Sequence, residues 1–312
     1  MTLVQLEYII AVDTYKSFVL AAEKSFVTQP TLSMQIQKLE KSLGVRIFDR
    51  SKQPIVPTDI GAVVINQARN VLKERDKIKE LISETQDELG GEIRIGVIPT
   101  LAPYLLPKIL GTFMEKYPKM KLQIWESTTT KVIQELKLGL LDCGILSTPL
   151  DDNELSENPL FYESFVAYIS SDSNLNNTVT VNAADLLEEK LWLLNEGHCM
   201  RNQVLNICHK KRMLNPEQTL EYNTGSVETL KRMVDMNSGV TILPELSILD
   251  FGEDDLEHVR YFKSPEPVRE ISLVTTKNSL KKKAISFLKD EILSVVPEKF
   301  KSSKRKELMS ID

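Results

Sequence analysis

Two cysteines nine residues apart are the residues of this chain whose types and spacing could do chemistry. Cys199 lies between His198 and Arg201, and Cys208 follows at the far end of the same segment. Positive charge near a thiol favours the thiolate, which is the form that attacks oxidants. A second thiol can then condense with the oxidised thiol to give a disulfide. The pair predicts a redox site; buried inert thiols or, with a poorer match in spacing, a zinc site are the alternatives.

A helix between the two cysteines would keep their sulfurs apart. Residues 200–207 can form such a helix, and nine helical residues rise about 13.5 Å. A disulfide tolerates Cα atoms at most about 7 Å apart. We therefore expect that forming the bond remodels the segment, which is the physical basis of a redox switch.

The length and composition indicate a globular protein with two or three domains. The chain has 312 residues, of which 42% are hydrophobic and 27% charged. It starts without a basic, apolar leader, and no apolar run approaches the length of a membrane span. We expect a cytoplasmic protein with no membrane partner, no cofactor and no metal. Three cysteines do not make a disulfide scaffold, and a cytoplasmic disulfide would be transient.

The N-terminal residues predict a module that is slightly basic within an acidic chain. The net charge is −5, yet residues 1–57 carry seven Lys and Arg against five Asp and Glu. This balance permits contacts with DNA phosphates. The lysines between 281 and 306 are typical of a solvated helix face instead.

Residues 1–57 predict three helices followed by a two-stranded wing. The helices are expected at 3–12, 18–25 and 29–43, and the wing at 45–57. Ser17 and Thr28 can cap the second and third helices, and Gly44 ends the third. The expected apolar face of the first helix is Leu3, Leu6, Ile9 and Ile10.

A short turn between the second and third helices is typical of a helix-turn-helix, although a plain three-helix bundle is the alternative. The third helix would enter the major groove by its N-terminal end, with the wing on phosphates. The residues expected to face DNA are Gln29, Pro30, Thr31, Ser33, Gln35, Lys38, Arg50 and Lys52.

Residues 59–89 predict a long linker helix, capped by Thr58 or Asp59 and ended by Gly90 and Gly91. Apolar and polar residues recur at heptad spacing, which favours a dimer, although a lone surface helix shows a similar stripe. The expected seam is Ile60, Val64, Gln67, Val71, Glu74, Ile78 and Leu81.

The rest of the chain alternates strands and helices, which predicts an α/β domain with a mostly parallel sheet. Strands are expected at 92–97, 121–125 and 143–146, and helices at 101–116 and 131–138. Residues 161–170 would cross into a second lobe, and 269–275 with a helix at 279–293 would return. The predicted domains are a DNA-binding domain at 1–58, a linker at 59–89 and a regulatory domain at 90–312. The last comprises lobe I, 92–162 plus 268–300, and lobe II, 163–267.

Two segments, 21–33 (AAEKSFVTQPTLS) and 39–50 (LEKSLGVRIFDR), resemble the winged helix-turn-helix of the LysR-type regulators. Residues 57–61 (PTDIG) resemble the start of that family's linker helix. The resemblance implies a transcription regulator that binds promoter DNA as a homodimer or homotetramer and contacts RNA polymerase. It also implies a two-lobed regulatory domain shaped like periplasmic binding proteins, with an effector cleft.

The regulatory domain most resembles the peroxide-sensing members of that family. The matching segments are 98–107, 141–143, 196–199 with Arg201, Gln203 and Cys208, 226–230 and 239–244. The resemblance implies that hydrogen peroxide is the signal, that Cys199 is the peroxidatic thiol and that Cys208 resolves it. The expected surroundings of the thiolate are Thr100, Thr129, His198, Arg201 and Arg269.

Several residues and alternatives remain beside this hypothesis. Cys143 is expected in the core and Gln203 on a helix surface, and Glu221, where some members carry histidine, receives no role. A LysR-type regulator that binds a metabolite and carries inert thiols would have the same fold. A thiol peroxidase is disfavoured by the DNA-binding module, so we expect no enzyme.

Overall fold

The chain divides into two compact units, Met1–Asp87 and Glu88–Asp312. The computed structural model describes residues 1–84, 90–186, 189–208, 224–279, 281–301, 306–309 and 311. Among these residues, no helix is both long and apolar enough to cross a membrane. The divisions predicted at 58, 89 and between the lobes stay predictions.

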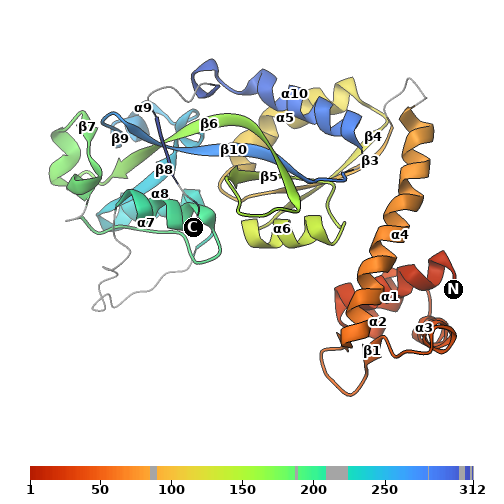
Figure 1. Cartoon of the computed structure of the whole chain (residues 1–312). Coiled ribbons are helices and arrows are strands. Elements are labelled where there is room, and N and C mark those ends of the chain that lie inside the picture. Colours follow the sequence, from red (N-terminus) through yellow and green to blue (C-terminus); the bar gives the residue numbers. More distant parts are fainter. Residues whose placement is uncertain are drawn as a thin grey trace. The chain divides into compact units, whose positions relative to one another are not determined.

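The first unit is a winged helix-turn-helix followed by a long helix (Figure 1). The second and third helices each begin at a capping side chain. Ser17 accepts a hydrogen bond from the backbone of α2, and Thr28 accepts one from the backbone of α3. Gly44, at φ +70°, ends α3 as predicted. The elements are α1 (Leu3–Tyr15), α2 (Phe18–Lys24), α3 (Gln29–Leu43), β1 (Phe48–Asp49), β2 (Val56–Pro57) and α4 (Asp59–Glu84).

The predicted apolar face of the first helix is confirmed at Leu6 and Ile9 and wrong at Leu3, and the helix ends later than predicted. α1 continues to Tyr15, because residues 13–15 contain no helix breaker. Its buried residues are Gln5, Leu6, Ile9 and Val12. Leu3 is exposed and Ile10 is only partly buried, since α1 turns residues 5, 9 and 12 toward the core of the unit.

The α4 helix packs on its own unit through a face that only partly coincides with the predicted seam. Ile65 and Ala68 are buried there, and Arg69 and Arg75 form ion pairs with Asp13 and Glu7 of α1. Two seam residues, Val64 and Val71, pack partly against the same core. The exposed seam residues are Ile60, Gln67, Glu74 and Ile78. The side chain of Leu81 and residues 85–89 lie outside the described part, and dimerisation through α4 stays a prediction.

The second unit is a mixed α/β domain built on one curved sheet (Figure 1). Its first elements are β3 (Gly91–Val97), α5 (Ala102–Lys116), β4 (Met120–Glu126), α6 (Thr129–Lys137), β5 (Cys143–Thr148), β6 (Leu155–Ile169) and β7 (Thr180–Val181). They are followed by α7 (Cys199–Ile207), α8 (Val227–Asn237), β8 (Val240–Pro244), α9 (Glu253–Leu256), β9 (Val259–Phe262), β10 (Glu266–Thr276), α10 (Lys282–Val295) and β11 (Lys306–Leu308).

The strand order is β4-β3-β5-β10-β6-β9-β7, with β11 beside β10 and β8 beside β6. The β3 strand is parallel to β4 and β5, as the βαβ pattern predicts. The expectation of a mostly parallel sheet is nevertheless wrong, because β10 runs antiparallel to β5 and β6, and β6 runs antiparallel to β8 and β9. Only residues 149–154 join β5 to β6, which is too short for the crossover that a parallel strand requires.

The two long strands β6 and β10 pass through both lobes and hold them in one sheet (Figure 1). Lobe I carries β3, β4 and β5 with α5, α6 and α10, whereas lobe II carries β7, β8 and β9 with α7 and α8. The buried side chains of both lobes form one continuous hydrophobic cluster. Any group at the lobe boundary is therefore positioned by strands that belong to both sides.

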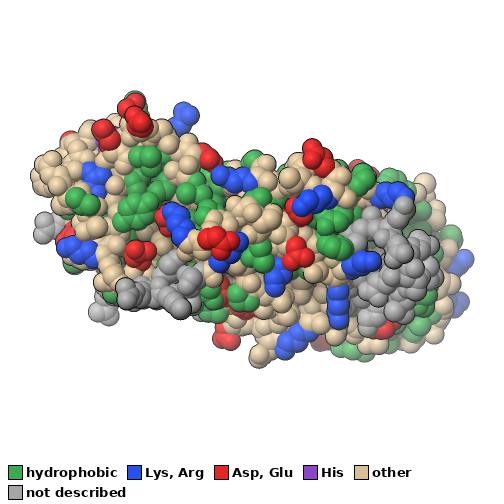
Figure 2. All heavy atoms as spheres, turned by 90° about the horizontal axis from the view of Figure 1, so that it is seen from above, with side chains coloured by type: hydrophobic (Ala, Val, Ile, Leu, Met, Phe, Trp, Pro, Cys, Tyr) green, Lys and Arg blue, Asp and Glu red, His purple; other side chains and the backbone are tan. Residues whose placement is uncertain are grey.

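Acidic and basic side chains are interspersed on the face of Figure 2. Lys116 contacts Glu291 of α10, and Lys281 donates to Asp142. Lys301 pairs with Glu298. This pairing agrees with a solvated face at 281–301 and not with a concentrated positive patch.

Replacement of Gly61 by alanine tests the close packing at the start of α4. A Cβ atom here would lie 1.9 Å from the carbonyl oxygen of Ile47, which is part of the backbone and has little room to move. We expect Gly61→Ala to lower the free energy of unfolding by about 1–3 kcal/mol. Thermal unfolding followed by circular dichroism measures the change.

Gly111→Ala is the control, since nothing lies within 4 Å of its added Cβ and alanine favours the helix by about 1 kcal/mol. Equal melting temperatures for the Gly61 variant and the unmodified protein would contradict the close approach.

Candidate redox site at the start of α7

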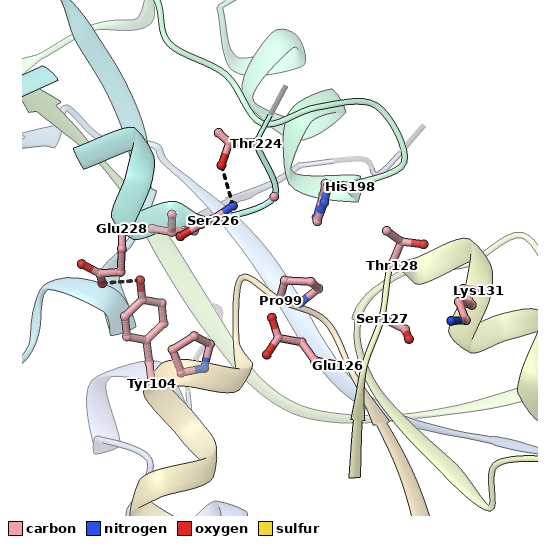
Figure 3. A pocket seen from close by; sticks show the side chains of 13 residues that line it. Pro99, Tyr104, Glu126, Ser127, Thr128, Lys131, His198, Thr224, Ser226 and Glu228 are labelled. Atoms are coloured by element: carbon pink, nitrogen blue, oxygen red, sulfur yellow. Dashed lines mark hydrogen bonds between the residues drawn. The ribbon is translucent and has the colours of Figure 1, made fainter. Parts of the chain in front are cut away.

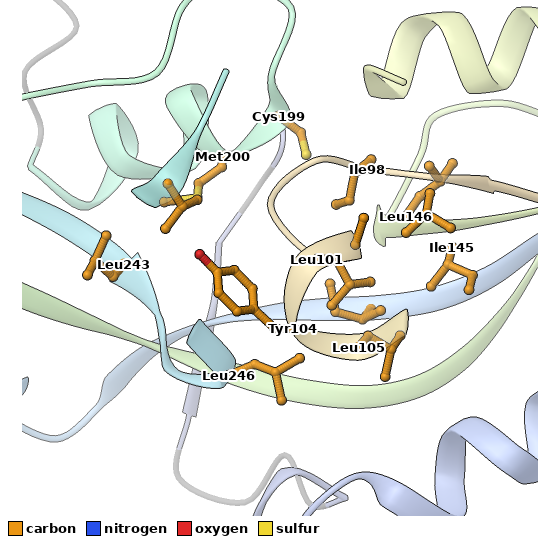
Figure 4. Close-up of a cluster of buried hydrophobic side chains, with 14 of the residues drawn as sticks. Ile98, Leu101, Tyr104, Leu105, Ile145, Leu146, Cys199, Met200, Leu243 and Leu246 are labelled. Atoms are coloured by element: carbon orange, nitrogen blue, oxygen red, sulfur yellow. The ribbon is translucent and has the colours of Figure 1, made fainter. Parts of the chain in front are cut away.

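Cys199 is the first residue of α7 and is 8% exposed. Gly197 turns the chain at φ +91° into this helix, a conformation that favours glycine. Figure 4 shows the Cys199 side chain at the edge of the buried cluster, pointing toward the loop that carries Ile98. The predicted helix is present and begins one residue early.

Cys208 directly follows α7 and is fully buried. The nine helical residues from Cys199 to Ile207 separate the two positions by about 13.5 Å along the axis. Both cysteines are reduced thiols in this structure. The pair therefore cannot form a disulfide until α7 changes its conformation.

The electrostatics of the Cys199 thiol reflect opposing effects. Burial raises the pKa of the thiol, because a charged sulfur loses solvation there. Thr129, Arg269 and the backbone N–H groups of Met200 and Cys199 lower it in part. The net direction is upward, so the resting side chain is mainly a protonated thiol whose thiolate is stabilised from several sides.

Thr129 is the first residue of α6 and lies at the thiol. Its hydroxyl oxygen is buried and makes no regular hydrogen bond among the described residues. Its effect on the thiol is therefore that of a loose polar contact. A buried hydroxyl that makes only a loose contact can also hold a small polar molecule.

His198 and Arg201 are predicted to lower the pKa of the Cys199 thiol through positive charge or hydrogen-bond donation. Burial instead lowers the pKa of His198, so the imidazole is neutral at neutral pH. The Arg201 guanidinium donates to the carbonyl oxygen of Leu194 at 2.8 Å. Arg269 lowers the Cys199 pKa by its charge. The roles of His198 and Arg201 at the thiol stay predictions.

Arg269 is completely buried and joins two sides of the site. Its Nε donates to Glu163 at 2.8 Å, and its Nη1 donates to the Thr100 hydroxyl at 2.8 Å. Nη2 also donates to the Thr100 carbonyl oxygen. Glu163 accepts a further hydrogen bond from the backbone of Leu246. Burial raises the pKa of Glu163, and Arg269 opposes the rise.

Glu163 is a site residue that the sequence analysis missed. A single acid within the apolar stretch Phe161–Ile169, together with a single arginine within Val268–Thr275, was a detectable signal. Each would be costly alone in a strand core, and a buried charge requires a partner. Phe165 also lies near the guanidinium, with 6.0 Å between its ring centroid and the Arg269 carbon.

Gln203 was expected on a helix surface, and this expectation is wrong. Its side chain is fully buried, and Nε2 donates to the Ser147 hydroxyl at 3.1 Å and to the Met309 carbonyl oxygen at 3.3 Å. Cys143 is buried in β5 as expected, and burial raises the pKa of its thiol. Glu221 lies outside the described residues.

Two cavities adjoin the redox segment. One, of about 320 Å³, is lined by Cys199 and Thr129 together with Ile133, Leu150 and Ile311. The other, of about 540 Å³, lies between the lobes (Figure 3). His198 lines both. Among the described residues, no group of three His, Cys, Asp or Glu side chains could hold a metal ion.

The larger cavity has polar walls from both lobes. Thr128 and Lys131 face it from lobe I, and His198 and Ser226 face it from lobe II (Figure 3). Tyr104 of α5 and Glu228 of α8 also line this cavity, and the Tyr104 hydroxyl donates to Glu228 at 2.8 Å.

Most of the predicted DNA-facing residues are exposed on the first unit. Gln29, Pro30 and Thr31 are exposed at the start of α3. Lys38 and Lys52 are exposed as well.

Three other residues predicted to contact DNA, Ser33, Gln35 and Arg50, form hydrogen bonds within the unit. Gln35 accepts a hydrogen bond from Gln5, and Arg50 donates to Ser33 and Glu40. Arg50 also lies over the ring of Phe18 at 4.9 Å.

Both halves of the chain match described families. Residues 3–62 match the bacterial regulatory helix-turn-helix proteins of the lysR family, and residues 86–296 match the LysR substrate binding domain. The chain belongs to the lysR family. Its winged helix-turn-helix and two-lobed domain are thus the DNA-binding and regulatory parts typical of these regulators.

Within the lysR family, the chain is similar to OxyR proteins over most of its length. A hydrogen peroxide-inducible genes activator from Pectobacterium carotovorum subsp. carotovorum is 37% identical, over 88% of this chain and 90% of that protein. The DNA-binding transcriptional dual regulator OxyR from Escherichia coli K12 is 36% identical, over 88% and 89%. A full-length OxyR variant from Pseudomonas aeruginosa superposes with a TM-score of 0.76 and 33% identity, over 94% of this chain and 98% of that chain.

Replacement of Thr129 by valine tests the polar contact at the thiol. A hydroxyl that stabilises the thiolate lowers the Cys199 pKa, so its removal raises that pKa and leaves less thiolate at neutral pH. We expect Cys199 alkylation in Thr129→Val to shift to higher pH. At pH 7 the rate should fall roughly fivefold, which corresponds to a hydrogen bond of about 1 kcal/mol.

Mass spectrometry of the Cys199 peptide, from pH 6 to 10, gives the rate. Thr130→Val is the matched control, because Thr130 is exposed on the same turn. Superimposable profiles for Thr129→Val and the unmodified protein would show that the hydroxyl does not act on the thiol.

Proposed function

We propose that this lysR-family protein is a transcription regulator that senses hydrogen peroxide through a reversible Cys199–Cys208 disulfide. The observation that carries the proposal is the position of Cys199. The thiol lies at a cavity beside the buried Thr129 hydroxyl and within the field of Arg269. The similarity to hydrogen peroxide-inducible activators supports the same conclusion.

The chemistry balances with peroxide as the only oxidant. The Cys199 thiolate attacks one peroxide oxygen, the O–O bond breaks, and hydroxide leaves as water after taking a proton. The sulfenic acid on Cys199 is then attacked by the Cys208 thiolate, and a second water leaves as the S–S bond forms. Thr129, Thr100 and Arg269 supply the polar groups near the first step. Two thiols and one peroxide thus give one disulfide and two waters.

The structure indicates why the disulfide would act as a switch. Closing the bond must bring the Cα atoms from about 13.5 Å apart to within about 7 Å, so α7 must unwind. Met200, Val204 and Ile207 are buried on α7, and each contributes roughly 1.5–3 kcal/mol to the helical state. The lost burial of these three side chains therefore opposes the disulfide. A bond opposed in this way is easy to reduce, as a reversible sensor requires.

The remaining parts of the proposal concern partners. The exposed α3 start with Lys38 and Lys52 would bind promoter DNA, and the exposed seam of α4 would form a homodimer, with a homotetramer through the regulatory domains. The protein would also contact RNA polymerase and act in the cytoplasm. It would act as a regulator and not as an enzyme.

A regulator that responds to a small metabolite is the second candidate. The observation that favours it is the cavity of about 540 Å³ between the lobes, with polar groups on both walls. A peroxide molecule is far smaller than this space. In that case peroxide would leave DNA binding unchanged.

Cysteine variants test the assignment of the thiols. Cys199→Ser should abolish the change in DNA binding that substoichiometric peroxide causes. Cys208→Ser should stop the reaction at a sulfenic acid on Cys199, which dimedone labels and mass spectrometry locates. Cys143→Ala should respond like the unmodified protein, since Cys143 is buried in β5. A dimedone label on Cys208 or Cys143 would mean that the roles are wrongly assigned.

The salt dependence of DNA binding tests the first unit. We expect Lys38→Ala and Lys52→Ala each to weaken binding to duplex DNA and to reduce the slope of log K against log salt by about 0.9. Each would do so because one phosphate contact and its released counterion are lost. Fluorescence anisotropy on DNA of arbitrary sequence gives the slope. Lys121→Ala, which removes an exposed lysine from β4, is the control. Unchanged slopes for both α3 and wing variants would refute the assigned surface.

A further inference from the structure

A short segment near the end of the described chain contacts both the strand of Arg269 and the helix between the two cysteines. This β11 segment consists of residues 306–309 and 311. β11 pairs parallel with β10, with Leu308 opposite Val268. The Met309 N–H then donates to the Val268 carbonyl oxygen at 2.8 Å. Val268 immediately precedes Arg269, so the segment borders the residue that influences the Cys199 thiol.

The other side of the β11 segment is held by α7. Asn202 Nδ2 donates to the Ile311 carbonyl oxygen at 3.2 Å, and Gln203 Nε2 donates to the Met309 carbonyl oxygen at 3.3 Å. Both donors lie between Cys199 and Cys208. The Gln203 amide is fully buried and also reaches Ser147 of β5. One side chain of α7 therefore joins the segment to the sheet.

The side chains of the segment complete the surroundings of Cys199. Met309 is 8% exposed and belongs to the hydrophobic core of the unit. Ile311 packs against that core and forms a wall of the cavity that opens onto Cys199. Leu308 precedes Met309 and lies opposite Val268. Its side chain is 45% exposed and does not belong to the core.

These contacts require α7 to be helical. Asn202 and Gln203 present their amides to the β11 segment from consecutive positions of the first turns of α7. When the Cα atoms of Cys199 and Cys208 approach to about 7 Å, this turn cannot persist, and both amides leave their acceptors. The Met309 carbonyl oxygen then loses its donor on α7, and the Met309 side chain loses the backbone contact that holds it in the core.

We propose that the β11 segment is a strap on the redox switch: it holds α7 in the reduced conformation and is released with α7 when the disulfide forms. Met309 and Ile311 are positioning residues that act through α7. Their contacts set how readily the disulfide forms and how easily it is reduced. The inference rests on the proposed function, because it requires the Cys199–Cys208 disulfide.

Hydrogen exchange of the full-length protein, reduced and peroxide-oxidised, tests the coupling directly. We expect residues 199–208 and 306–311 to lose protection together on oxidation, and Cys208→Ser to lose it in neither segment. Loss of protection at 199–208 alone would overturn the strap and leave the proposed function intact. Unchanged protection in both segments would overturn the proposed switch itself, and the strap with it.

A redox titration separates the strap from an ordinary structural role. If the segment is released on oxidation, Met309→Ala destabilises only the reduced form. We expect the equilibrium constant for disulfide formation in a dithiothreitol buffer to rise at least tenfold. Leu308→Ala, on the same segment with an exposed side chain, should change it less than twofold.

A residue buried equally in both states would destabilise both forms, so Met309→Ala would lower the melting temperature and leave the redox constant unchanged. That result would overturn the proposal. Should Met309→Ala fail to fold, the exchange experiment on the unmodified protein still decides the question.

Discussion

The buried ion pair between Arg269 and Glu163 is the interaction on which the rest of the site depends. Both side chains are fully inaccessible to solvent, and they lie on the two strands that pass through both lobes. Removal of one partner of such a pair typically costs about 3–5 kcal/mol, because the other charge is left without compensation. The pair must therefore form whenever β6 and β10 assemble. Its remaining donors then hold the Thr100 loop beside the start of α7.

Burial has two effects at Cys199 that work together. It raises the thiol pKa, which keeps the resting sulfur protonated. It also places the thiol against a cluster of side chains that exclude water, so that Thr129, Arg269 and the N-terminus of α7 act on the sulfur through a low dielectric. A thiol in these surroundings stays protonated and unreactive until an oxidant occupies the adjoining cavity. The same buried residues of α7 oppose the unwinding that the disulfide requires, and this opposition makes the response reversible.

Much of the fold could be predicted from local sequence signals. The limits of α3, from the Thr28 cap to Gly44, follow from hydrogen bonds and dihedral angles within a few residues, and local interactions of this kind do not depend on distant packing. The βαβ order of lobe I and the helix after Cys199 were also evident. The antiparallel course of β10 was not, because it depends on which strand β10 meets after a long separation in the chain.

The sequence by itself determined the chemistry that is available: two thiols nine residues apart, with a helix between them that prevents their bonding. Only the tertiary structure decided which groups surround the thiol. Arg201, two residues away in the sequence, donates to the Leu194 carbonyl oxygen, and His198 is neutral in its buried position. The distant Arg269 acts on the sulfur. The physical reason is that a helix start directs adjacent side chains to different sides, whereas a buried charge goes where its counter-charge lies.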